Sequence, residues 1–159
     1  MAAYALAISN GVAGQIANQD PHSVHSGVAE VAMPFGVAVI VGAADSTLNT
    51  PAASTATVAG VSVSTYANAN AGFALGIQPQ DAVSVLTNGT IYVISETAVT
   101  ANGATPSPVY VRYTINGGLN QLGSFRTDAD TSRALLLSQA KWLTSCAAGG
   151  LAQLQINLP

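Results

Sequence analysis

The two histidines of the chain lie close together and beside an aspartate. Asp20, His22 and His25 occur in the run Asp-Pro-His-Ser-Val-His. Imidazole and carboxylate groups at this spacing can bind zinc from a loop, but a zinc site also needs a fourth ligand and supporting hydrogen bonds. The run supplies neither. We therefore interpret it as a polar loop and predict that the protein binds no metal and no cofactor.

Nucleophilic chemistry has little support in the sequence. Cys146 is the only cysteine, so an internal disulfide cannot form, and no histidine is identifiable as its base. A Gly-x-Ser-x-Gly elbow does not occur, and no glycine-rich segment has the arrangement that binds phosphate. We predict that the protein is not an enzyme. A small β-barrel enzyme that uses His22 or His25 is the alternative, which turnover abolished by substitution of either histidine would support.

Two further motifs have a chemical and a structural interpretation. Asp128 and Asp130 could face a sugar or Ca²⁺ from one side of a strand, but a capped turn explains the pair more simply. Asn88-Gly89-Thr90 matches the glycosylation acceptor pattern, and it also matches a hairpin turn that leads into a strand. We predict a turn at both places.

The chain contains very few ions. Four Lys or Arg and seven Asp or Glu make up 7% of its 159 residues, against about 25% in ordinary soluble domains. Hydrophobic residues account for 49%, so much of the surface must be apolar or uncharged. Such a surface is typical of proteins that other proteins cover; a compact monomer kept soluble by hydroxyls and amides is the alternative. With net charge −3 and four basic residues, we predict no nucleic-acid partner.

The charges are unevenly placed along the chain. Residues 1–106 contain five acids and no base, whereas residues 107–159 contain four bases and two acids. Opposite signs on two parts of a chain can orient neighbouring subunits, although chance placement explains the distribution equally well. The candidate protein-contact residues are Arg112, Arg126, Arg133 and Trp142. Trp142 is expected mainly in the core, with a subunit contact as the alternative.

Turns and short strands dominate the pattern along the chain. Four Asn-Gly dipeptides predict hairpins. The expected strands are 28–33, 37–42, 57–64, 73–77, 82–86, 90–95, 108–115, 119–126, 140–146 and 151–158. Alternation of apolar and polar residues is clearest over 151–158, which should pair with 140–146; residues 128–140 fit a strand slightly better than a short capped helix. We predict an all-β protein, an antiparallel sandwich or barrel, with a jelly roll as the first choice.

The expected organisation is an irregular N-terminal arm, residues 1–26, followed by a single β-rich domain, residues 27–159. The start of the chain lacks the basic region of a signal peptide. Its longest uncharged apolar stretch, 31–44, is shorter than the roughly 20 residues of a membrane-spanning helix. We therefore expect no membrane association and synthesis in the cytoplasm.

Several short motifs are shared with a known family. They are Ala13-Gly14-Gln15-Ile16-Ala17, Pro34-Phe35-Gly36-Val37-Ala38-Val39, Gly76-Ile77, Val83-Ser84-Val85-Leu86, Gly89, Ile91-Tyr92-Val93, Val99, Gly103, Val109-Tyr110-Val111 and Ala148 to Ile156. Together they resemble the capsid decoration, or structural cement, proteins of tailed bacteriophages. One departure is Ala104, where the family often has an acid.

The resemblance implies a β-rich protein without an active site that is added to the outside of the virion. Its expected partner is the major capsid protein of an HK97-type shell. The resemblance also implies a homo-oligomer, for which we prefer a trimer and keep a dimer as possible. The protein would be made in the host cytoplasm and would stabilise the assembled shell. A carbohydrate- or receptor-binding β module is the alternative, and it would need exposed aromatic side chains.

Overall fold

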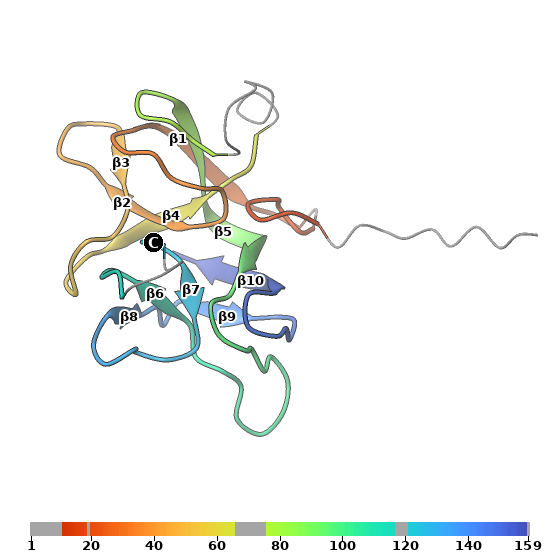
Figure 1. Cartoon of the computed structure of the whole chain (residues 1–159). Coiled ribbons are helices and arrows are strands. Elements are labelled where there is room, and N and C mark those ends of the chain that lie inside the picture. Colours follow the sequence, from red (N-terminus) through yellow and green to blue (C-terminus); the bar gives the residue numbers. More distant parts are fainter. Residues whose placement is uncertain (1–10, 19, 66–75, 117–120, 159) are drawn as a thin grey trace, which may run out of the picture.

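The computed structural model describes residues 11–18, 20–65, 76–116 and 121–158, and this part of the chain contains strands and no helix (Figure 1). The strands are β1 Ser23–Ala29, β2 Ala38–Val41, β3 Thr47–Asn49, β4 Val58–Ser62, β5 Ala82–Ile94, β6 Tyr110–Arg112, β7 Phe125–Arg126, β8 Ala134–Leu136, β9 Ala140–Trp142 and β10 Leu151–Asn157. The predicted all-β class is confirmed. No helix long and apolar enough to span a bilayer occurs among these residues.

Five strands close into a barrel. They pair in the order β1-β3-β2-β4-β5, and β5 returns to pair with β1. The β1–β3 pair is parallel, and the other pairs of the ring are antiparallel. Apolar side chains fill the inside of the ring: Ala29, Met33, Val37, Val39, Leu48, Ile77, Val83 and Val85. The described ring is therefore a five-stranded barrel, whereas a jelly roll has eight strands in two sheets.

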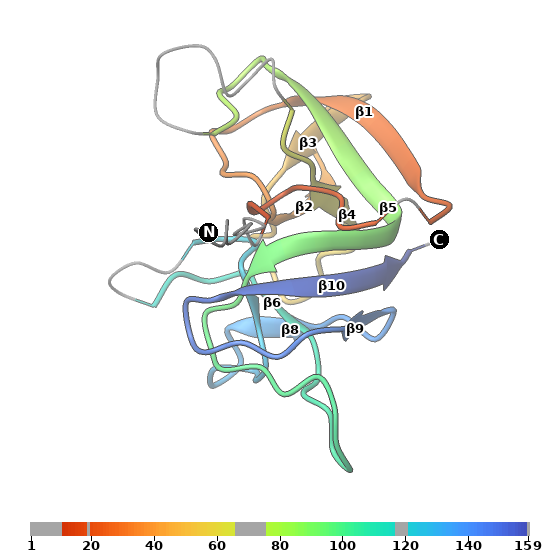
Figure 2. The ribbon, with the colours of Figure 1, turned by 90° about the vertical axis from the view of Figure 1, so that its right-hand side faces the viewer.

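β5 belongs to the barrel and to the sheet beside it. Its first half pairs with β1, from Ser23↔Asn88 to Val28↔Ala82, and its second half pairs with β10, from Asn157↔Asn88 to Leu151↔Ile94. Figure 2 shows the bend between the two halves. The hairpin turn predicted at Asn88-Gly89 is wrong, because both residues lie inside this continuous strand. Neighbouring strands on both sides hold the backbone there, and Gly89 provides the bend with a φ of +131°.

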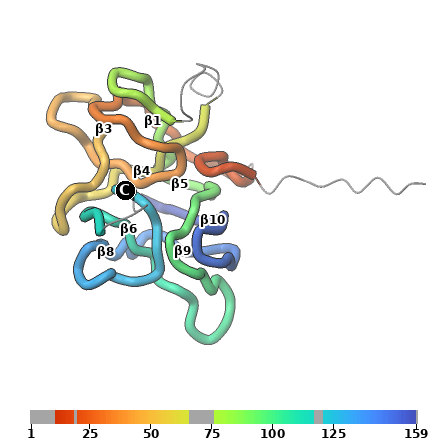
Figure 3. Tube along the Cα trace, in the orientation of Figure 1, coloured from red at the N-terminus to blue at the C-terminus, as the bar shows by residue number. Residues whose placement is uncertain are grey.

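A second, three-stranded sheet packs against this extension. Its order is β7-β6-β8, and the strands lie below the barrel in Figure 3, next to β9 and β10. The main core fills the space between the layers and includes Leu86, Ile91, Phe125, Trp142 and Leu154. Two layers around one apolar core satisfy both sheets, each of which has one apolar face.

The closing hairpin forms as predicted, and several other strands are shorter than the sequence predicted. β9 and β10 pair antiparallel, with Leu154 opposite Trp142, as predicted for 140–146 and 151–158. Over 128–140 the structure has strand β8 and no helix, so the strand interpretation is confirmed. The strands expected at 108–115 and 119–126 are reduced to β6 and β7, and most of 73–77 lies outside the described residues.

The N-terminal segment contacts the second half of β5. The backbone N–H of Gly14 donates to Tyr92 O at 2.8 Å, and that of Ala17 donates to Thr90 O at 2.8 Å. β1 begins at Ser23, so the expected irregular structure is wrong over 23–26. The division into an arm and one domain stays a prediction, and residues 1–10 lie outside the described part of the chain.

Candidate functional site

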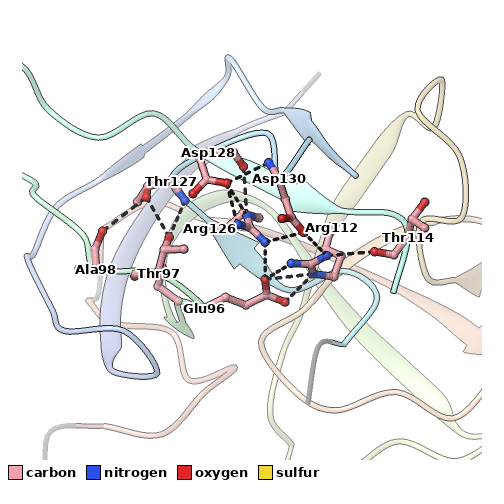
Figure 4. A network of polar contacts seen from close by, with 10 residues as sticks. Glu96, Thr97, Ala98, Arg112, Thr114, Arg126, Thr127, Asp128 and Asp130 are labelled. Atoms are coloured by element: carbon pink, nitrogen blue, oxygen red, sulfur yellow. Dashed lines mark hydrogen bonds and ion pairs between the residues drawn. The ribbon is translucent and has the colours of Figure 1, made fainter. Parts of the chain in front are cut away.

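Five of the charged side chains gather in one network between β5 and the three-stranded sheet (Figure 4). Glu96 follows the end of β5, Arg112 ends β6 and Arg126 ends β7. Asp128 and Asp130 lie in the loop between β7 and β8. The fold therefore brings together charges from positions 96 to 130.

Arg112 is the centre of the network and is 1% exposed. Its Nε and Nη2 donate to the two carboxylate oxygens of Glu96 at 2.8 and 2.6 Å. Its Nη1 donates to Asp130 Oδ2 at 2.8 Å and to Thr114 O at 3.0 Å. The hydrogen bonds to Glu96 raise the pKa of Arg112, although burial acts in the opposite direction. Bidentate pairing of this kind satisfies a buried guanidinium that would otherwise be costly to desolvate.

Arg126 shares the same acceptors from the neighbouring strand. Its Nη1 lies 3.0 Å from Glu96 Oε2 and 3.1 Å from Asp130 Oδ2, and its Nη2 lies 2.6 Å from Asp128 Oδ1. Glu96 Oε2 thus accepts from both arginines. This shared carboxylate ties β6 and β7 to the end of β5.

The network also holds a strained loop. Asp130, Thr131 and Ser132 have φ values of 44°, 54° and 62°, and each non-glycine residue in this left-handed region costs about 1–2 kcal/mol. Asp128 Oδ1 accepts from the backbone N–H of Asp130 at 2.9 Å, which is the capped turn that the sequence predicted. The Tyr113 hydroxyl donates to Ser132 O. Side chains of Arg112 and Tyr113 at the end of β6, and of Arg126 and Asp128 at the end of β7, therefore hold this loop.

The candidate contact residues lie in different environments. Arg112 and Arg126 are buried in the network, and Trp142 is 4% exposed, with its Nε1 donating to Pro108 O at 3.1 Å. The ring of Trp142 meets that of Phe125 edge-on at 6.4 Å. Arg133 is half-buried and makes no ion pair with the described residues. A contact of any of the four with another protein stays a prediction.

Sequence reasoning missed the role of Glu96, and it interpreted the arginines as a surface group. The proximity of Arg126 to Asp128 and Asp130 in the sequence was an available signal for part of the network. Nothing local connects Glu96 with Arg112, because only strand pairing across the second sheet brings them within reach.

The other residues with chemical potential do not form a site in the described part of the chain. His22 Nδ1 lies 3.0 Å from the backbone oxygen of Asp20, and no three His, Cys, Asp or Glu side chains converge on a metal position there. Burial raises the pKa of the Cys146 thiol, which disfavours the reactive thiolate.

The family model of a "Structural cement protein (E217 gp24/Pam3 gp6)" matches residues 2–157. The chain belongs to this structural cement family of bacteriophages. Its function is that of a decoration protein that stabilises a phage capsid, and its family is one of structural phage proteins. The cement protein therefore associates with a capsid shell.

Two solved structures share the fold of this cement protein. One, titled "The capsid of Myoviridae Phage XM1", has a TM-score of 0.68 and 18% identity, and the match covers 98% of both chains. The other is the head fiber gp8.5 N base of bacteriophage phi29, with a TM-score of 0.52 and 12% identity over 86% of this chain and 95% of that one. No curated protein gives a significant match.

The described surface of the cement protein exposes large apolar side chains from several elements. They are Val12, Val24, Val28, Val41, Ile94, Ile115 and Leu136. They include positions on β1, β2, β5 and β8. Exposed apolar side chains therefore occur on both the barrel and the three-stranded sheet.

Proposed function

We propose that this cement protein binds the outer surface of an HK97-type shell as a homo-oligomer, with a trimer preferred over a dimer, and clamps neighbouring major capsid subunits. The protein is made in the host cytoplasm and then joins the virion. It binds no cofactor and catalyses no reaction. Family membership supports a role on the capsid, and the chemistry of the described exterior supports the manner of binding.

The observation that carries the proposal is that several of the few charged side chains pair inside the protein, which leaves the surface with even less charge. The chain has eleven charged residues, and Glu96, Arg112 and Arg126 direct their charges into the internal network. Exposed valine, isoleucine and leucine side chains remain on several faces. Burial of such a surface against a partner gains hydrophobic free energy with few ions to desolvate.

Stabilisation of the shell then follows from mass action. A protein that binds only the assembled shell stabilises it by RT ln(1 + [L]/Kd) at each site, where [L] is the free concentration of cement protein. The contributions of many sites on one shell add together. A modest affinity for each site therefore gives the whole capsid a large resistance to dissociation.

Binding to bare shells tests the proposal. Purified protein is incubated with shells that lack it, and co-sedimentation and the temperature of shell disruption are measured. We expect saturable binding at micromolar protein and a higher disruption temperature. No binding at this concentration would remove the proposal. Labelling of bound protein by a reagent that cannot enter the shell distinguishes the outer from the inner surface.

The oligomeric state and the role of Arg133 need separate measurements. Light scattering after size-exclusion chromatography is expected to give the mass of a trimer, and a monomer at high concentration would contradict the oligomer.

We further propose that Arg133 contacts the shell, so that Arg133→Glu lowers occupancy without unfolding the protein. Lys141→Glu, at an exposed residue of β9, is the control; equal occupancy of both variants would reject the contact.

A further inference from the structure

The loop between β7 and β8 combines backbone strain with exposure. Asp130, Thr131 and Ser132 are consecutive residues with positive φ, and Thr131 and Ser132 are exposed. Strain of this kind persists only where surrounding contacts impose it, and it is concentrated at functional sites. Here the ion pairs of Asp130 with Arg112 and Arg126 impose the conformation. A loop held in this way keeps one shape before any partner arrives.

A groove of about 450 Å³ adjoins this loop. The groove is lined by residues 54–56 and by Tyr113, Ala129, Ser132, Ala134, Leu135 and Leu136. Leu136 is 55% exposed. No Asp, Glu, Lys or Arg lines the groove, because the nearby charges of Asp130, Arg112 and Arg126 pair with one another inside the network.

We propose that this groove receives an uncharged segment of the capsid shell protein, with Leu136 as the central contact. This inference rests on the proposed function, which supplies the shell as partner. The neutral lining selects a neutral occupant, since a charged one would lose its hydration without gaining an ion pair. The rigid loop lowers the entropy lost on binding, because the groove is already formed.

Two substitutions at exposed apolar residues test the groove. Leu136→Glu places a charge at the groove, and Val41→Glu places the same charge on β2 of the barrel, where Val41 is 66% exposed. Thermal unfolding of both variants is expected to match that of the unchanged protein, which shows that both fold. We expect Leu136→Glu to weaken binding to shells at least tenfold and Val41→Glu less than twofold.

The outcomes separate this inference from the proposed function. If the unchanged protein fails to bind shells, the proposed function itself fails. If it binds and Leu136→Glu binds equally well, or if both variants lose binding to the same extent, the groove is not the docking site. A change in the oligomeric mass of free Leu136→Glu would also overturn the inference, because the groove would then join copies of this chain.

A third variant tests the role of the rigid loop. Thr131→Gly accepts a positive φ without strain and leaves the side chains that line the groove unchanged. We expect unchanged thermal unfolding or a higher midpoint, together with binding weakened severalfold because the loop gains freedom in the unbound protein. Binding equal to that of the unchanged protein would show that a preformed loop is not required.

Discussion

At the residue scale, a charged side chain occupies a fully buried position of the kind that apolar side chains fill elsewhere in the protein. Among the described residues, Arg112 is the largest side chain that is fully buried. Its guanidinium is acceptable there because Glu96, Asp130 and Thr114 O accept its hydrogen bonds. Removal of one partner from such a group leaves the others buried and unpaired, which is more costly than the net gain of the pair.

Arg112→Met therefore tests the network. Methionine keeps much of the buried volume but leaves Glu96 and Asp130 with Arg126 as their remaining cation. Breaking a buried ion pair costs about 3–5 kcal/mol. We expect the free energy of unfolding in urea to decrease by an amount at the lower end of this range, because Arg126 still compensates both carboxylates. Lys141→Met, at an exposed residue, is the control and should change stability by less than about 0.5 kcal/mol. Equal effects would show that the network contributes nothing.

Acid should weaken the fold through two carboxylates. The hydrogen bond from Arg112 lowers the pKa of Asp130 below its ordinary 3.8, and the hydrogen bond from Thr47 lowers the pKa of Glu30 below its ordinary 4.5. Each carboxylate is thus more acidic in the folded chain than in the unfolded one. Each stabilises the fold above its ordinary pKa, and this contribution is lost as pH falls through the folded pKa.

Urea unfolding between pH 7 and pH 3 measures this effect. We expect the free energy of unfolding to decrease below about pH 5, and Asp130→Asn to have a shallower decrease. Asp45→Asn is the control, because Asp45 is exposed and makes no ion pair with the described residues. A profile for Asp130→Asn parallel to that of the unchanged protein would contradict this role of Asp130.

At the scale of elements, β5 connects the two parts of the fold. Its residues pair with β1 and β4 in the barrel and with β10 in the extension. Gly89 lies at the bend with a φ of +131°, and a Cβ there would come 2.8 Å from His22 Cβ. Both the backbone conformation and the close approach of the segment before β1 therefore require glycine at this position.

Gly89→Ala should consequently be much more harmful than the same change in a loop. We expect it to lower the free energy of unfolding by about 3 kcal/mol through backbone strain and overlap. Gly103→Ala is the matched control, since Gly103 has a similar φ of +126° and no atom within 4 Å of the added Cβ. The loop around it can relax, so a loss below about 1 kcal/mol is expected. Similar losses in both variants would show that β5 tolerates the change.

At the scale of the whole molecule, two apolar clusters share their supporting strands. Val83 and Val85 of β5 face the barrel interior, while Leu86, Ile91 and Val93 of the same strand face the main core. A loss of packing in one cluster must therefore disturb the strand that supports the other. The described part of the chain is expected to unfold as one cooperative unit, which is the behaviour of a single domain.

Ile77→Ala tests this cooperativity. Ile77 is fully buried inside the barrel, and its truncation should cost about 2–5 kcal/mol. Trp142 reports on the other cluster, so its fluorescence should show the same lower urea midpoint as far-ultraviolet circular dichroism. Thr55→Ala, at an exposed residue, should leave both midpoints in place. An unchanged midpoint for Trp142 in Ile77→Ala would mean that the barrel unfolds separately.

Much of the class and function followed from local features of the sequence. Short β-branched segments between turn residues predicted an all-β sandwich or barrel, and alternation over 151–158 predicted the hairpin of β9 and β10. The scarcity of charge and of nucleophiles favoured a structural protein, and short apolar motifs resembled the family that the chain belongs to. These features are local because strand propensity and side-chain alternation depend on neighbouring residues.

Tertiary structure alone decided the rest. Asn88-Gly89 has the composition of a hairpin turn, yet β1 and β10 hold it in an extended strand. Arg112 and Arg126 are of a residue type usually found at the surface. Glu96 and the acids of the loop before β8 nevertheless pair with them inside the protein. In both cases a partner distant in the sequence supplies a larger free energy than the local preference, and its position exists only once the strands have paired.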